Sequence, residues 1–481
     1  MRIIAIFADL FRHNLSIKSH LNTYTSLARK IILEGLFVYQ SICTLLIVWL
    51  LSACSTYGEI RNESIKARGI KKSYSLKSFH DKFSDSDSFV ILSFSGGGTR
   101  AAALAYGVLQ ALRNTSFVSN GKPMSLLDDV DVISSVSGGS FTAAYYGLYG
   151  DKIFYDFKKV FLYHHIEKQI LKRFLNPFFI ISPQGRTEAA IEYYQRTIFK
   201  YATFNDMMRP NAPMIIINAS DLGYGVRFSF TQEYFNLLCS DLSEFPIARA
   251  VTASSAVPLV FNPVVLENHD KCAKKSLKAS HGTQDKNNLE VQMMLKGLNS
   301  YENKEHRKFV HLVDGGITDN LGLRSLHDML EVAGGAKFLM KQLKLRAPKR
   351  IVLISVDAST EPELLMDNTR RRPSIAETIG AMSNAQLHRY NVATVELLKD
   401  QLRQWSQQLS TPDNKIKPYF IQLGFKDLKS SEQQQYFNTI PTSFSLSREQ
   451  VDKLISVGQQ LIHDNPDYQK LLGDIKAVSS Q

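Results

Sequence analysis

The segment Val130-Asp131-Val132-Ile133-Ser134-Ser135-Val136-Ser137-Gly138-Gly139 predicts an apolar strand that runs into a tight turn, and the residues from Phe141 onward can continue as a helix. A serine on a strand-to-helix turn needs small neighbours two positions before and after it, because larger side chains would collide with the strand or the helix. Ser135 and Gly139 meet that need. The sequence therefore predicts a nucleophile elbow centred on Ser137, although a stretch of serine and glycine is also typical of a plain loop.

A second strand, loop and helix precede the elbow. An apolar run at 89–92 leads into Ser95-Gly96-Gly97-Gly98-Thr99-Arg100, and an alanine-rich, helix-like run follows at 101–109. Glycines leave backbone N–H groups unshielded, and the N-terminus of a helix favours negative charge. This loop is therefore expected to bind either a phosphate or the oxyanion that forms during acyl transfer.

A dinucleotide-binding site is an alternative for the same loop, because Gly96, Gly98 and Ala101 fit the pattern Gly-x-Gly-x-x-Ala. Such a site needs an acidic residue at the end of the second strand to bind the ribose. The second strand here ends in serines, and Asp131 lies near its beginning. The dinucleotide-binding alternative thus lacks the acidic residue that would bind the ribose.

The third element is the apolar run 309–313, which leads into Asp314, Gly315 and Gly316. A carboxylate at a strand end can accept the proton of a serine hydroxyl if the fold brings the two groups together. An Asp-Gly pair is also common in surface turns. His311 is the competing base, but it stands three residues before Asp314 in a strand, so the two side chains should point to opposite faces.

Together and in this order, the three segments resemble the patatin-like phospholipase family. The family pattern is a glycine-rich oxyanion loop with a basic residue, a GxSxG serine and a later Asp-Gly-Gly or Asp-Gly-Ala. The resemblance covers about residues 89–323, including the stretches 218–222 and 253–258. Two departures are Ser135 in place of glycine and Ser95 in place of a frequent aspartate.

The resemblance implies that Ser137 is the nucleophile and Asp314 its general base. It also implies a set of supporting residues: oxyanion-hole amides at Gly96, Gly97 and Gly98, a loop brace at Arg100, and structural glycines at Gly139, Gly315 and Gly316.

Apolar segments alternate with helical patterns along most of the chain. The predicted strands are Phe89–Phe94, Val130–Val136, Pro213–Asn218, Phe309–Val313, Arg350–Val356 and Pro418–Leu423. This alternation predicts an α/β fold with three layers, α/β/α, around a mainly parallel central sheet, with active residues at the carboxyl ends of the strands.

The expected domain organisation has three parts. Residues 1–53 are expected to be a signal peptide, and residues 54–88 a lipidated cysteine followed by a flexible tether. Residues 89–481 are expected to form the catalytic domain, with an insertion near 270–308 and closing C-terminal helices.

The apolar stretch 44–54 ends in Leu51-Ser52-Ala53-Cys54, which resembles the lipobox of a bacterial lipoprotein. Cleavage before Cys54 and acylation of its thiol would anchor the protein without a membrane span. The alternative is a transmembrane anchor over 35–53, which carries no charge. Ser55 follows the cysteine and favours the outer membrane of a bacterial envelope, facing the periplasm. The long charged region before the stretch favours a translation start downstream of Met1.

The remaining cysteines and the charge bear on compartment and partners. Cys239 and Cys272 either pair in an oxidising compartment or stay free thiols, and no metal-binding motif accompanies them. We therefore expect an enzyme without a metal or other cofactor. Without residues 1–53 the chain carries 52 Lys and Arg against 43 Asp and Glu, and this net charge of +9 favours anionic phospholipid headgroups. The sequence does not interleave aromatic with basic residues, so it does not predict a nucleic-acid partner.

These features lead us to expect a serine acyl-ester hydrolase of the phospholipase or lysophospholipase type. The lipid substrate is implied by the resemblance, whereas the residues alone indicate acyl transfer. A lipid transacylase is one alternative. Another is a lipid-anchored binding or assembly protein on an inactive hydrolase fold. Such a protein would be expected to lack one of the dyad residues, whereas Ser137 and Asp314 are both present.

Overall fold

The computed structural model describes residues 58–65, 73–84, 86–119, 122–164, 185–258, 260–270, 272, 289–361 and 369–479, with several positions between 34 and 44. The chain divides into two compact units, Met1–Tyr57 and Gly58–Gln481. The described positions of the first unit are helical, and the lipobox at 51–54 lies outside the described residues. Within the described part of the chain, no helix combines the length and apolar character needed to cross a bilayer.

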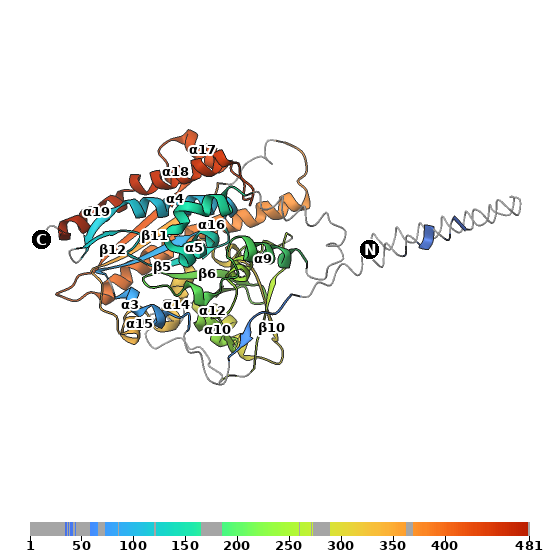
Figure 1. The fold of residues 1–481 in the computed structure, drawn as a ribbon, viewed down its shortest axis with the longest axis horizontal. Helices are drawn as coiled ribbons and strands as arrows, with labels where there is room; N and C mark the ends of the chain where they lie inside the picture. The colour runs from blue at the N-terminus through green and yellow to red at the C-terminus, as the bar shows by residue number, and fades with distance from the viewer. Residues whose placement is uncertain are drawn as a thin grey trace, which may run out of the picture. The chain divides into compact units, whose positions relative to one another are not determined.

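The second unit is built around an eight-stranded sheet (Figure 1). Its strands are β2 (Ser88–Phe94), β5 (Val130–Val136), β6 (Met214–Asp221), β7 (Val226–Ser229), β9 (Val264–Glu267), β10 (Phe309–Asp314), β11 (Arg350–Asp357) and β12 (Lys417–Gly424). The order is β12-β11-β2-β5-β6-β10-β9, with β7 also paired to β6. The first five strands in this order are parallel, whereas β7, β9 and β10 pair in antiparallel fashion. The predicted mainly parallel sheet is confirmed.

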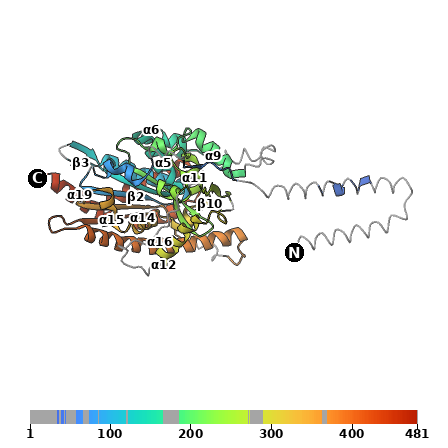
Figure 2. The same ribbon diagram turned by 90° about the horizontal axis from the view of Figure 1, so that it is seen from below.

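Helices cover both faces of the sheet, as the three-layer prediction requires. One face carries α4 (Gly98–Asn114), α5 (Gly138–Tyr149) and α18 (Arg448–Asp464), and the other carries α14 (Arg324–Ala333), α15 (Ala336–Leu343) and α16 (Ile375–Leu409). Figure 2 shows α5 and α16 on opposite sides of the sheet. The central strands β5 and β6 are buried along their whole length, and this includes polar residues such as Asp131, Ser134 and Asn218.

Shorter elements complete the unit. Further helices are α3 (His80–Phe83), α6 (Ile153–Phe157), α9 (Gly185–Thr197), α10 (Gln232–Leu237), α11 (Ile247–Ser254), α12 (Leu289–Asn299), α13 (Gly316–Asp319), α17 (Ser431–Asn438) and α19 (Pro466–Ser479). Two small sheets pair β1 (Glu63–Ser64) with β8 (Ser240–Asp241), and β3 (Ser116–Ser119) with β4 (Lys122–Ser125).

Residues 58–65 and 73–84, expected to belong to a flexible tether, are packed on the catalytic body. β1 pairs with β8, and the Tyr74 side chain is fully buried, with its hydroxyl donating to Ile215 O at 3.0 Å. Phe79 and Phe83 are buried beside it. The tether prediction is wrong for these residues because three aromatic side chains bury far more apolar surface than the polar composition suggests.

The insertion expected near 270–308 is described by the structure from residue 289 onward. It contains α12, whose buried residues are Val291, Met294, Leu295, Gly297 and Leu298. Residues 271 and 273–288 lie outside the description. Just before this region, Cys239 and Cys272 form a disulfide, with their Cα atoms 5.4 Å apart. Of the two alternatives that the sequence left open, a disulfide or two free thiols, the structure has the disulfide.

Candidate active site

Ser137 occupies the turn between β5 and α5 with φ 50° and ψ −121°. This positive φ is costly for a residue with a side chain, by about 1–3 kcal/mol, and is typical of a nucleophile elbow. A Cβ placed on Gly139 would lie 2.7 Å from both Phe94 Cβ and Ser95 O, so glycine is needed there. Ser135 is tolerated two positions before Ser137, where its hydroxyl donates to Ile216 O at 3.1 Å.

Ser137 and Asp314 are in direct contact. The Ser137 hydroxyl donates to Asp314 Oδ2 at 2.8 Å, and the two residues are only 5% and 8% exposed. The sheet register explains the contact, because Val136 pairs with Asn218 from one side and Asp314 pairs with Ala219 from the antiparallel side. The ends of β5 and β10 thus meet beside adjacent residues of β6.

The surroundings of Asp314 make its carboxyl less acidic than that of an exposed aspartate. Burial raises the pKa of its carboxyl to about 6, and hydrogen bonds from the Gly316 N–H and the Ser137 hydroxyl oppose that rise. The Gly316 N–H donates to the second carboxylate oxygen at 2.8 Å. His311 is exposed whereas Asp314 is buried, in keeping with the alternation expected along β10.

Ser254, at the end of α11, links the Ser137 turn to the Asp314 strand end. Its hydroxyl accepts the Ser137 N–H at 2.8 Å and donates to Asn218 O at 2.6 Å. Its carbonyl accepts the Gly315 N–H at 3.0 Å, and Ala256 O accepts the Asp314 N–H at 3.0 Å. The segment 254–256 therefore holds both halves of the pair. The resemblance marked this stretch as part of the site but assigned no role to Ser254.

The glycine loop lies against the elbow, with one correction to the expected oxyanion hole. The Gly96 N–H donates to Asn320 O at 3.0 Å and is not available as an oxyanion donor. Gly97 and Gly98 have φ values of 135° and 60°, and their amides donate to no acceptor within the described ranges. A Cβ on Gly138 would lie 2.0 Å from Gly98 O, so the loop and the elbow are in backbone contact. Two free amides thus remain beside Ser137.

Arg100 ties the glycine loop to distant segments of the chain. Its guanidinium donates to Ala358 O at 2.8 Å, to Thr442 Oγ1 at 2.9 Å and to Ile440 O. Burial lowers the pKa of this guanidinium to about 10, and Asp357 opposes that shift. Nearby, the Ser95 hydroxyl accepts the Ala358 N–H at 2.8 Å. The brace predicted for Arg100 thus has three acceptors, two of them after residue 430.

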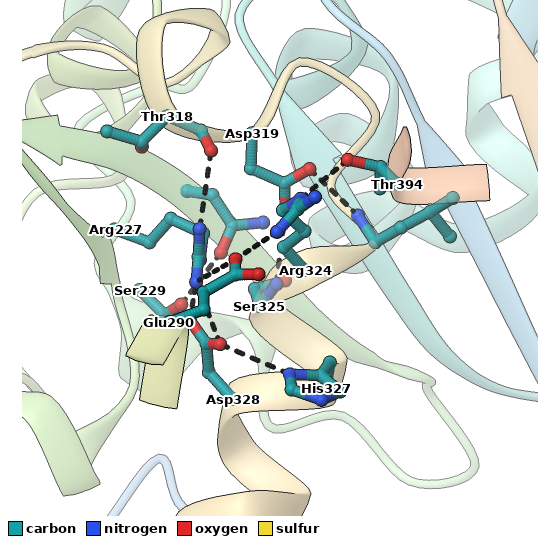
Figure 3. A network of polar contacts seen from close by, with 12 residues as sticks. Arg227, Ser229, Glu290, Thr318, Asp319, Arg324, Ser325, His327, Asp328 and Thr394 are labelled. Carbon is teal, nitrogen blue, oxygen red and sulfur yellow. Dashed lines mark hydrogen bonds and ion pairs between the residues drawn. The ribbon is translucent and has the colours of Figure 1, made fainter. Parts of the chain in front are cut away.

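A buried polar network fixes the chain downstream of Asp314 (Figure 3). Arg227 on β7 makes a bidentate ion pair with Asp328 on α14 and donates to Thr318 O at 3.4 Å. Burial alone would raise the pKa of Asp328, but Arg227 and His327 together outweigh it and the pKa is lowered. In the same network, Arg324 donates to Thr394 Oγ1 at 2.6 Å. The helices that follow Asp314 are therefore bound to β7 and α16.

No cluster of His, Cys, Asp and Glu suited to a metal ion occurs in the part of the chain that the structure describes.

Asn320 and Arg227 are site-supporting residues that the sequence analysis did not single out. Asn320 follows directly on the Asp-Gly-Gly stretch, which was a usable signal. Arg227 lies on the short strand β7, which the sequence analysis did not predict because it contains no apolar run.

Comparison with known proteins finds one matching family model and several similar solved structures. Residues 92–327 match the family model described as patatin-like phospholipase, and this range includes Ser137, Asp314 and the glycine loop. A structure of human GIVD cytosolic phospholipase A2 is similar at a TM-score of 0.39 and 14% identity, covering 83% of this chain and 61% of that chain. The present chain thus corresponds to less than two thirds of that human protein.

Two further solved structures are similar. One is the same human protein in complex with methyl gamma-linolenyl fluorophosphonate, with a TM-score of 0.33, 13% identity and coverage of 88% of this chain and 70% of that chain. The other is VipD from Legionella pneumophila, with a TM-score of 0.30, 12% identity and coverage of 87% and 71%. No curated protein sequence matches the chain.

Proposed function

Because residues 92–327 form a patatin-like phospholipase domain, we propose that this protein is a serine acyl-ester hydrolase of the phospholipase or lysophospholipase type. It releases fatty acids from membrane lipids with Ser137 and Asp314 as its catalytic dyad. The observation that carries the proposal is the 2.8 Å hydrogen bond from the Ser137 hydroxyl, held on a strained elbow, to a buried carboxylate whose pKa is about 6. A carboxylate with that pKa is ionised at neutral pH yet more basic than an exposed aspartate.

In the first half-reaction, the Ser137 oxygen attacks the ester carbonyl carbon while Asp314 takes the hydroxyl proton. The carbonyl oxygen becomes an oxyanion, which accepts hydrogen bonds from the amides of Gly97 and Gly98. Donors of this kind lower the barrier by about 3 kcal/mol each. The carbon–oxygen bond to the lipid alcohol then breaks, and Asp314 returns the proton to the departing oxygen. An acyl ester on Ser137 remains.

In the second half-reaction, water attacks the acyl carbon of that ester and Asp314 takes the proton of the water. The oxyanion forms again at Gly97 and Gly98. When it collapses, the bond to the Ser137 oxygen breaks, Asp314 protonates that oxygen, and the fatty acid leaves. The same carboxylate therefore acts as base and then acid in both half-reactions.

The proposed setting is the bacterial cell envelope, with an acylated Cys54 anchoring the protein to the outer membrane facing the periplasm. The Cys239–Cys272 disulfide supports an oxidising compartment. Mass spectrometry of the mature N-terminus tests this setting. A diacylglyceryl-modified Cys54 is expected, and an unmodified chain that retains residues 35–53 would favour the transmembrane alternative.

The function is tested by fatty-acid release from phospholipid and lysophospholipid vesicles. Wild-type protein is compared with Ser137→Ala and Asp314→Asn, and matched controls are the exposed residues in Ser78→Ala and Asp400→Asn. We expect release by the wild type and both controls, and a loss of at least a thousandfold in the two dyad variants. Equal fatty-acid release by all five proteins, with no labelling of Ser137 by a fluorophosphonate, would contradict the proposal.

A further inference from the structure

Four exposed apolar residues lie a few positions along the chain from Ala256 or from Asp314: Val257, Pro258, Val260 and Ile317, here called the apolar rim. Val257 is 40% exposed, and Val260 and Ile317 are each 52% exposed. Single apolar side chains on a protein surface are ordinary, but a group of them around one site marks a binding surface.

The apolar rim borders Asp314 on two sides. Val257 follows Ala256, whose carbonyl accepts the Asp314 N–H at 3.0 Å. Ile317 follows Gly316, whose N–H donates to the Asp314 carboxylate at 2.8 Å. A surface that covers the rim would therefore also lie close to Asp314.

The backbone holds the first part of the rim in place. The N–H groups of Val260 and Phe261 both donate to Val257 O, at 3.2 and 3.0 Å. The turn is also tied to α9, since the Thr187 hydroxyl donates to Asn262 O at 2.8 Å. These bonds present the valine side chains to solvent and oppose their collapse onto the core.

The N-terminal arm, residues 58–65, joins the body at the same place. A Cβ on Gly58 would lie 2.4 Å from Val265 Cγ2, and Val265 is only five residues beyond Val260. Glu59 pairs with Arg249 on α11 at 3.3 Å. Figure 2 shows α9, α11 and β10 at one end of the body and β3 and α19 at the other. The arm and the rim therefore share one end.

The sequence before Gly58 indicates what this end faces. Three residues separate Gly58 from Cys54, and such a span reaches at most about 14 Å. An acylated Cys54 would therefore keep the end that bears the rim close to a bilayer. The rim residues are aliphatic side chains and a proline, and they lack the tryptophan, tyrosine and arginine that dominate protein–protein hot spots.

We propose that the apolar rim is a membrane-docking surface that inserts into the outer part of a phospholipid bilayer and sets the dyad at the lipid surface. This inference rests on the proposed function and on acylation of Cys54. An acyl ester can then pass from the bilayer to Ser137 without crossing bulk water.

The first test compares an interfacial with a soluble substrate. The full chain with Val257→Ser and Val260→Ser is assayed on phosphatidylglycerol–phosphatidylethanolamine vesicles and on a short-chain soluble ester. We expect the ratio of vesicle to soluble activity to fall about tenfold, because burial of two valine side chains is lost. Val118→Ser is the matched control, since Val118 is 48% exposed on β3 at the other end of the body. Its ratio should stay within twofold of the wild type.

The second test reads membrane contact without any activity. Val260→Trp and Val118→Trp variants are added to vesicles of brominated phospholipid. The native tryptophans Trp49 and Trp405 stay in place, and the quenching measured for the wild type, which carries only these two, is subtracted. Quenching at position 260 and not at 118 supports the rim. Equal quenching at the two positions, or an unchanged activity ratio in the serine variant, overturns it and leaves a protein partner as the better occupant.

The two tests also separate failure of the inference from failure of the proposed function. A wild type that cleaves neither substrate contradicts the proposed hydrolase. Quenching at position 260 would then still support docking on lipid, and its absence would still contradict it.

Discussion

The backbone N–H of Ser137 donates to the Ser254 hydroxyl at 2.8 Å, and the same hydroxyl donates to Asn218 O at 2.6 Å. One buried serine thereby links the elbow at the end of β5 to strand β6, against whose other side Asp314 pairs. The position of Ser137 depends on this contact as well as on the elbow itself.

Replacement of Ser254 by alanine should slow acylation. The buried Ser137 N–H would lose its acceptor, which costs about 1–3 kcal/mol, and the elbow would relax away from Asp314. We expect kcat to fall at least tenfold with little change in KM, together with slower fluorophosphonate labelling. Ser255→Ala is the control, because the Ser255 hydroxyl donates only to carbonyls of its own helix. Equal effects of the two variants would contradict the role of Ser254.

The pH dependence of kcat/KM should show a single acid limb near pH 6. Asp314 must be ionised to take the Ser137 proton, and burial raises its pKa to about 6. Activity on a soluble ester should therefore fall about tenfold per pH unit below that value. A profile that is flat from pH 7 to pH 4.5 would exclude Asp314 as the base.

Asp314 should also destabilise the folded protein at neutral pH. Its pKa is about 6 in the fold against an ordinary 3.8, so folding favours the protonated form and stability is lost as pH rises from about 4 through 6. Asp314→Asn should raise the free energy of unfolding at pH 8 by roughly 3 kcal/mol, and the gain should vanish below pH 4. Urea unfolding at both pH values measures this. A variant less stable than the wild type at pH 8 would contradict the assignment.

Gly139→Ala should unfold or disarm the elbow. The added methyl group would lie 2.7 Å from Phe94 Cβ and Ser95 O, and overpacking of this kind costs roughly 1–3 kcal/mol or more. Gly473→Ala is the control, because it lies in α19 with open space around it. That change should stabilise the protein by about 1 kcal/mol. Thermal unfolding of the two variants should therefore shift in opposite directions.

Arg100→Lys should weaken the oxyanion hole although it keeps the charge. A lysine ammonium cannot satisfy Ala358 O, Ile440 O and Thr442 Oγ1 together, as the planar guanidinium does. The loop that carries the Gly97 and Gly98 amides would then shift, and kcat should fall by at least tenfold. Arg113→Lys, at an exposed ion pair with Asp151, should change kcat less than twofold. A similar kcat for both variants would show that Arg100 does not position the loop.

Most of the central sheet could be predicted from the sequence, because buried strands need continuous apolar runs. All six predicted strands are present, with bounds that differ by at most a few residues. The short strands β7 and β9 were missed. Each has only four residues, too few for a pattern to identify a strand, and they form strands because β6 and β10 offer them hydrogen-bonding edges.

The residues of the candidate site were identified by local constraints that sequence can express. A turn at Ser137 that excludes side chains needs Gly139, and a loop of converging amides needs glycines at 96–98. Which amides remain free was not predictable. Gly96 is occupied because Asn320, more than two hundred residues later, places its carbonyl against it.

The sequence by itself determined the layered α/β class, the elbow serine, the strand-end aspartate and the glycine loop, since each depends on neighbouring residues and on local sterics. The tertiary structure alone decided the distance from Ser137 to Asp314, the part played by Ser254 and the acceptors of Arg100. Those contacts join strands and loops far apart in the chain, and the register of an antiparallel strand beside β6 sets them.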